Sequence, residues 1–145
     1  MPRILATIVL VICGWCASAQ TTSLTVISNA KGSPPDLKLS ELKSIMLGER
    51  QRWRSGNKIV IGLMKTNTDL GKAISEKIYN MTPDEVRKYW LALVFQGKAD
   101  APTFFNTPNE LQAFVADNPG AIGVVEQVLP GYNTTVVSID GRKSF

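Results

Sequence analysis

Apolar residues are almost continuous in two stretches of the chain, and their flanking residues differ. The first stretch, Ile4 to Cys13, comes directly after Arg3 and is soon followed by the small residues Ala17-Ser18-Ala19. A short positive region, an apolar segment and small residues at a cleavage point are typical of a secretory signal peptide. We therefore predict that residues 1–19 are a leader that is cleaved off before Gln20.

Two alternatives for this leader are a membrane anchor and a lipid-modified cysteine. A membrane-spanning helix needs about 20 apolar residues, and this segment is shorter. A lipoprotein signal has a small residue before the modified cysteine, whereas Ile12 precedes Cys13 and Trp15 precedes Cys16. We therefore expect a periplasmic or secreted protein with no membrane span after cleavage, consisting of a single domain over residues 20–145.

The second apolar stretch, Lys58 to Met64, is typical of a strand that is buried on both faces of a parallel sheet. Residues 24–28, 121–125 and 135–139 are also rich in β-branched side chains and predict three more strands. Segments with helical spacing of apolar residues lie between these strands. Strands alternating with helices predict an α/β layer architecture with a largely parallel sheet.

Four predicted helices begin at a residue that can accept a hydrogen bond from the first turn. Ser40 is predicted to cap a helix that stops at Gly48, and Thr68 to cap the next. Thr82 and Thr107 are each followed by proline and then, two residues later, by glutamate, which is capping-box chemistry. The helix after Thr82 is predicted to bury Val86, Tyr89, Trp90, Leu93 and Val94.

The composition argues against several kinds of functional site. Both cysteines lie in the predicted leader and the chain has no histidine, so we expect no disulfide, no thiol nucleophile, no Ser-His-Asp triad and no metal site. Without Arg3, 15 basic and 12 acidic residues remain, a net charge near +3. This excess is small and scattered, so nucleic acid is not an expected partner.

One enzyme motif is present by pattern. Ser40-Glu41-Leu42-Lys43 matches Ser-x-x-Lys of penicillin-recognising enzymes, but Ser-Asp-Asn and Lys-Thr-Gly are both missing. Ser40 is better explained as a helix cap. We predict a protein that is not an enzyme, with no catalytic residue and no cofactor.

Several segments together resemble the phosphate-type periplasmic substrate-binding proteins. The resemblance rests on their order and spacing: Leu39 to Leu42, Ile45 to Gly48, Trp53, Gly56, Ile59, Tyr89-Trp90, Phe95, Gly97, Pro102, Asn118 to Val125, and Val137 to Gly141. It covers about one of the two lobes that full-length members have. It implies a three-layer α/β sandwich like one lobe of a type II periplasmic binding protein.

The same resemblance implies an oxyanion site after the second apolar stretch, where the family has an arginine followed by Ser-Gly-Thr at a helix N-terminus. Here Lys65 could take the place of the arginine, and Thr66, Asn67 and Thr68 could donate hydrogen bonds. Alternatively, Thr68 and Asp69 are the ordinary cap and first-turn acid of a helix. We also expect Asn29 and the loop up to Gly32 to face this ligand, at the carboxyl ends of the strands.

A basic cluster, Arg50 to Arg54, has two interpretations. It could be a surface for a partner or an anionic polymer, or Trp53 could pack under a turn while the arginines are solvated. For the whole chain the resemblance implies an exported solute-binding protein for phosphate or another oxyanion, with a membrane permease or another periplasmic protein as partner. The alternative is an interaction or scaffold module that has lost solute binding.

Overall fold

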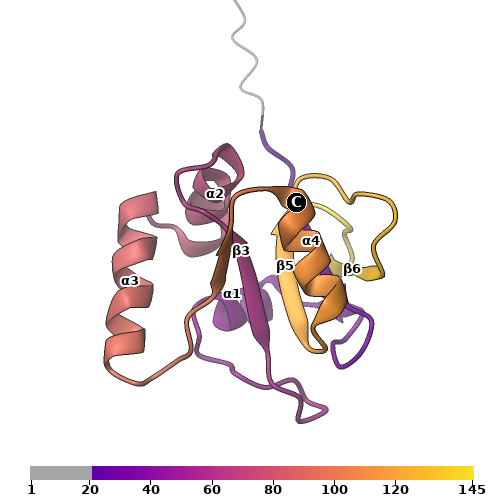
Figure 1. Cartoon of the computed structure of the whole chain (residues 1–145), viewed down its shortest axis with the longest axis horizontal. Helices are drawn as coiled ribbons and strands as arrows, with labels where there is room; N and C mark the ends of the chain where they lie inside the picture. The colour runs from indigo at the N-terminus through magenta and orange to yellow at the C-terminus, as the bar shows by residue number, and fades with distance from the viewer. Residues whose placement is uncertain (1–20) are drawn as a thin grey trace, which may run out of the picture.

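A mixed six-stranded sheet forms the centre of the molecule in the computed structural model, which describes residues 21–145 (Figure 1). The predicted leader lies outside the described residues. The strand order is β2-β6-β1-β5-β3-β4. The strands are β1 (Thr25–Asn29), β2 (Asp36–Leu37), β3 (Val60–Met64), β4 (Thr103–Phe105), β5 (Ala121–Val125) and β6 (Thr134–Ile139).

Strand β1 runs against the other five. It pairs antiparallel with β5 and with β6, whereas β2 is parallel to β6 and β3 is parallel to both β4 and β5. The prediction of a largely parallel sheet is therefore correct apart from this one strand. Its direction matters for the site, because the loop after β1 leaves the sheet at the edge opposite to the loops after β3 and β4.

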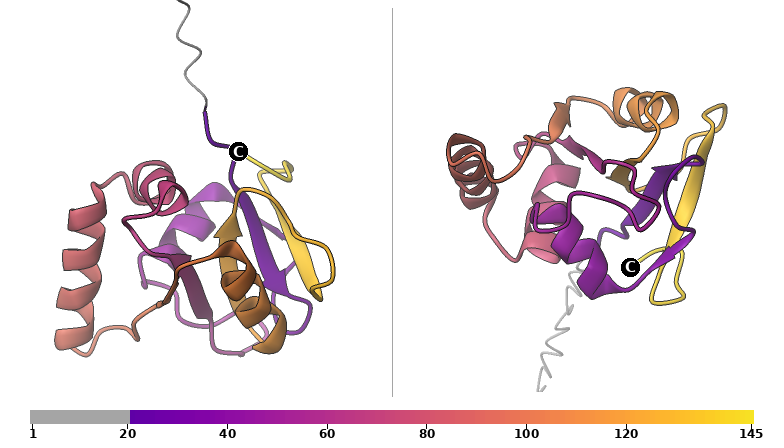
Figure 2. Two further views of the ribbon diagram at one scale, coloured as in Figure 1. Left: turned by 45° about the horizontal axis from the view of Figure 1, so that its top comes forward. Right: turned by 90° about the horizontal axis from the view of Figure 1, so that it is seen from below.

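Helices cover both faces of the sheet, which confirms the three-layer α/β sandwich (Figures 1 and 2). One face carries α4 (Pro108–Asp117), which contacts β1, β3 and β5. Gly62 and Gly123 let α4 approach closely, because a Cβ on Gly62 would lie 2.7 Å from Leu111. The other helices are α1 (Leu39–Met46), α2 (Asp69–Ile74) with the π-helical turn η1 (Ser75–Tyr79), and α3 (Pro83–Phe95).

Three of the four predicted helix caps are confirmed. The hydroxyl oxygens of Thr68, Thr82 and Thr107 each accept a backbone N–H from the first turn of α2, α3 and α4 respectively. The prediction for Ser40 is wrong. Helix α1 already begins at Leu39, because the Glu41 carboxylate accepts the N–H of Lys38 at 2.9 Å and so fixes the first turn two residues earlier.

The core is continuous across the sheet, and one predicted core residue is not part of it. Val86 and Trp90 of α3 are buried, and Tyr89 and Leu93 pack partly against the core, but Val94 is 42% exposed. It follows the buried Trp90 by four residues but lies in the last turn of α3, where the core no longer covers it, so its prediction as a buried residue is wrong. Among residues 21–145, no helix is long and apolar enough to cross a membrane.

Candidate functional site

The loop from β3 to α2 is held in a fixed shape by the residues at its two ends. The Lys65 carbonyl accepts two hydrogen bonds from Thr68, one from its N–H at 3.0 Å and one from its hydroxyl at 2.7 Å. The Thr68 hydroxyl oxygen in turn accepts the N–H of Gly71 at 3.0 Å. Gly71 is required here, because a Cβ at this position would lie 2.0 Å from the Lys65 carbonyl oxygen.

Several donors of this loop have no partner in the part of the chain that the structure describes. Lys65 and Asn67 are exposed, and Thr66 is half-buried. Within residues 21–145, Lys65 forms no ion pair, and the N–H groups of Thr66 and Asn67 have no protein acceptor. The loop therefore offers one cation and two backbone donors next to the start of α2. The Thr68 hydroxyl is committed to the cap, as the alternative from the sequence has it, and Asp69 is exposed in the first helical turn.

A second loop lies beside the first. Strand β4 pairs in parallel with β3, and the Lys65 N–H donates to the Phe105 carbonyl at 2.9 Å. Asn106 and Thr107 then lead directly into α4, so α2 and α4 both begin at this edge of the sheet. The N-terminus of a helix carries a partial positive charge. Lys65 and the start of α2 make this edge favourable for a small anion, whereas at the start of α4 the Glu110 carboxylate already accepts the N–H of Asn106. The sequence indicates Thr107 only as a helix cap. Its place beside Lys65 depends on the pairing of the short strand β4 with β3, for which the sequence has no local signal.

The structure does not bring Asn29 to this loop. Asn29 ends β1 at the opposite edge, where its neighbour Ser28 is paired with Ile122 near the start of β5. Its amide nitrogen donates to the carbonyls of Val115 and Ala116, both at 2.9 Å, and its oxygen accepts the N–H of Lys31 at 2.8 Å. The expectation that Asn29 faces the same ligand as Lys65 is corrected by the antiparallel direction of β1.

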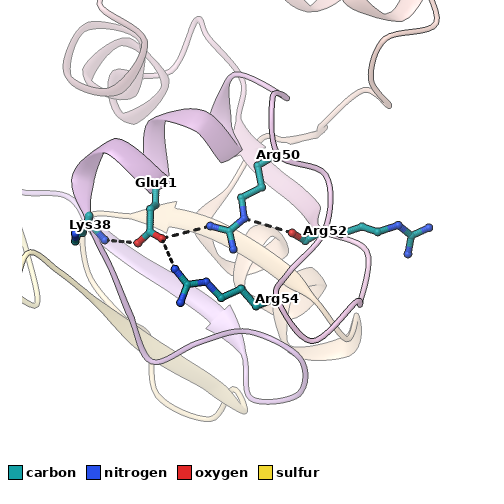
Figure 3. A network of polar contacts seen from close by, with 5 residues as sticks. All are labelled: Lys38, Glu41, Arg50, Arg52 and Arg54. Atoms are coloured by element: carbon teal, nitrogen blue, oxygen red, sulfur yellow. Dashed lines mark hydrogen bonds and ion pairs between the residues drawn. The ribbon is translucent and has the colours of Figure 1, made fainter.

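Two arginines of the basic cluster of residues 50–54 approach the Glu41 carboxylate, while the Arg52 side chain points away from it (Figure 3). Glu41 Oε1 lies 3.5 Å from Arg50 and 3.4 Å from Arg54, while its Oε2 accepts the Lys38 N–H. The Lys38 amide, followed by the two guanidinium groups, holds the pKa of Glu41 below its ordinary value. Trp53 is 3% exposed, and its indole N–H donates to the Gly120 carbonyl at 2.9 Å, which confirms the structural interpretation of this tryptophan.

A groove of about 810 Å³ runs along this cluster, beside α1. Its charged lining is balanced, because Lys38, Arg50 and Arg54 are matched by Asp36, Glu41 and Asp140. With Glu41 already bound to both arginines, the groove has no free excess of positive charge. Its charge balance makes this groove less favourable for an anion than the loop of residues 65–68.

Comparison with known proteins gives a likeness in structure alone. No protein-family model matches the chain, and no curated protein matches it. Among solved structures, PstS from Borrelia burgdorferi is similar with a TM-score of 0.62 and 14% identity, over 83% of this chain and 48% of that one. An ABC-type phosphate transport receptor from Vibrio cholerae is similar with a TM-score of 0.62 and 13% identity, over 85% of this chain and 48% of that one.

These likenesses define the class of fold. The chain has a periplasmic-binding-protein fold of the kind seen in phosphate receptors, as the resemblance in the sequence implied. It spans about half the length of the solved structures that it matches. The identities are low, so the likeness establishes the fold and leaves the ligand to be argued from the site.

Proposed function

We propose that the chain is an exported, non-enzymatic binding protein that holds a small oxyanion such as phosphate at the loop of residues 65–68. The observation that carries this proposal is the Lys65 ammonium and two backbone N–H groups that have no partner within residues 21–145, at the edge where α2 and α4 both begin. The similar solved structures, which include phosphate transport receptors, support the same class of ligand.

The chemistry of the loop is suited to weak, reversible binding of an oxyanion. Backbone amides, the positive ends of helices and one ammonium group can together bind an anion without a bidentate arginine. Asp69 acts against this, because its carboxylate lies in the first turn of α2 and repels an approaching anion. Delivery to a membrane permease is part of the same proposal, since the similar structures include receptors of ABC-type transport.

Phosphate titration of the purified protein, followed by tryptophan fluorescence and melting temperature, tests the proposal. At about one hundred times its Kd, a ligand adds about 2.7 kcal/mol to the free energy of unfolding. Lys65→Ala should remove most of this gain, and Asp69→Asn should lower the Kd. Lys72→Ala is the matched control, because Lys72 is also exposed on α2 but lies in its last turn.

Two outcomes would contradict the proposal in different ways. No shift in melting temperature with phosphate or sulfate at millimolar concentration would exclude oxyanion binding. Equal Kd values of Lys65→Ala and Lys72→Ala for phosphate would mean that the protein binds phosphate at another site, and would exclude this loop.

A second candidate function is an interaction module that uses the lobe as a scaffold. One specific observation favours it, namely a row of exposed apolar side chains on α3. Solute binding and this surface are on different elements, so the two functions are testable separately.

A further inference from the structure

The edge of the sheet around Lys65 holds more acidic than basic side chains. Three segments continue the chain beyond the parallel strands at this edge, namely residues 65–69 after β3, 106–110 after β4 and 126–133 after β5. Their charged side chains are one cation and three carboxylates, which belong to Lys65, Asp69, Glu110 and Glu126. None of the four forms an ion pair within residues 21–145. A bare dianion such as hydrogen phosphate therefore meets one attractive and three repulsive charges here.

The two lysines that follow on the same helix are placed differently from Lys65. Lys72 lies in the last turn of α2, at the far end of that helix from the loop. Lys77, on η1, already donates to the carbonyl of Thr22. Lys65 is thus the one cation that the three segments themselves offer to a ligand.

Glu126 lies level with Lys65 on the neighbouring strand. Strands β3 and β5 are parallel, with Gly62 opposite Gly123. Continuing this alignment places the first residue after β5, Glu126, opposite the first residue after β3, Lys65. Paired strands are about 4.8 Å apart, and both side chains are exposed. A small molecule bound at this edge therefore has a cation on one side and a carboxylate on the other.

The other two carboxylates already have favourable interactions. Glu110 Oε2 accepts the N–H of Asn106 at 3.3 Å. Asp69 lies in the first turn of α2, where the helix dipole stabilises a negative charge. Glu126 follows a strand and has neither interaction within the described residues. A single exposed carboxylate of this kind suits a single positive group, such as an ammonium.

We propose that the ligand of this site is an oxyanion that carries its own ammonium group, as an aminoalkyl phosphonate does. The oxyanion binds the Lys65 ammonium and the N–H groups of Thr66 and Asn67, while the ligand's ammonium binds Glu126. Inorganic phosphate uses the same donors but leaves Glu126 as a repulsive charge, so it binds less tightly. This inference rests on the proposed function, because it keeps the same oxyanion site and adds the second charged group of the ligand.

Two phosphonates of similar size test the ligand class. 2-Aminoethylphosphonate has an ammonium group where propylphosphonate has a methyl group, so the pair isolates the effect of one positive charge. We expect the native protein to bind the amino compound about fivefold more tightly, as an exposed ion pair allows. Titration of the exported protein, followed by tryptophan fluorescence and melting temperature, gives both Kd values.

Replacing Glu126 separates a binding role from a structural one. Glu126→Gln should bind 2-aminoethylphosphonate more weakly and propylphosphonate more tightly, because it removes an attraction for the first and a repulsion for the second. A loss of folded protein would not move the two Kd values in opposite directions. Asp117→Asn is the matched control, since Asp117 is exposed in the last turn of α4, beside the Ala116 carbonyl that Asn29 binds at the opposite edge. It should leave both Kd values unchanged.

Three outcomes would overturn the proposal, and they are distinguishable. Equal Kd values of the native protein for the two phosphonates, with phosphate still bound through Lys65, would exclude this ligand class and leave the proposed function intact. A preference for the amino compound that persists in Glu126→Gln would exclude Glu126 as the partner of the ammonium. Binding of neither phosphonate nor of inorganic phosphate would overturn this proposal and the proposed function together.

Discussion

The side-chain amide of Asn29 is fully hydrogen-bonded at the end of β1 and is only 6% exposed. Its two donated bonds satisfy carbonyls in the last turns of α4, which have few intrahelical partners of their own. The same side chain also fixes the turn at Lys31. Asn29 thus joins β1 to α4, and its role is structural. Lys65, by contrast, has an exposed side chain with no ion pair among residues 21–145.

Replacing Asn29 by aspartate tests this division of roles. The carboxylate keeps the shape of the amide but cannot donate, so the buried carbonyl of Val115 and the partly buried carbonyl of Ala116 lose their partner. We expect Asn29→Asp to lower the free energy of unfolding by about 1–3 kcal/mol and to leave the Kd for phosphate unchanged. Asn133→Asp, at an exposed position, serves as the control in chemical denaturation. Unchanged stability together with lost phosphate binding would instead make Asn29 a ligand residue.

At the level of the element, the start of α1 depends on an ionised carboxylate. Glu41 accepts the N–H of Lys38 and lies within 3.5 Å of Arg50 and Arg54 (Figure 3). An acid near the first turn of a helix is favourable both as an acceptor and through the helix dipole. This network, and not the Ser40 hydroxyl, fixes where α1 begins.

The lowered pKa of Glu41 predicts how stability depends on pH. The Lys38 amide and then the arginines lower this pKa in the folded protein below its ordinary value of 4.5. Glu41 therefore stabilises the fold above pH 4.5, and this contribution is lost as the pH falls through the lowered pKa. We expect the melting temperature of the native protein to exceed that of Glu41→Gln at neutral pH, and the difference to vanish in acid.

An Arg54→Gln variant is the control for this prediction. It should retain most of the pH-dependent difference, because the Lys38 hydrogen bond is the larger cause and remains in place. A difference between the native protein and Glu41→Gln that stays constant with pH would show that the carboxylate charge has no part in stability.

Elements with a strong local signal were predictable, and those made by distant pairing were not. Strand β5 was predicted at its observed bounds, and the caps at Thr68, Thr82 and Thr107 are local chemistry. Strands β2 and β4 have two and three residues, and their places in the sheet depend on pairing with β6 and β3. Val94 has the helical spacing of the buried Val86 and Trp90, but spacing alone cannot tell how far along α3 the core extends.

At the level of the whole molecule, the direction of one strand decides which loops can form a site together. The loop of residues 65–68 was predictable because it follows directly after a strong strand. That Asn29 lies at the opposite edge depends on β1 being antiparallel to β5 and β6, a long-range pairing that no local pattern contains. The backbone of Leu24 pairs with that of Phe145, so the described chain begins and ends at the same edge as the candidate site.

Removal of the leader would place a new N-terminus close to that edge. Cleavage before Gln20 predicts an exported protein without thiols, because both cysteines lie in residues 1–19. Intact mass and thiol titration of protein recovered from the exporting host measure this directly. An Ala19→Arg variant should block cleavage, since the peptidase needs a small residue there, and its product should keep two thiols. An exported native protein that retains residues 1–19 would contradict the prediction.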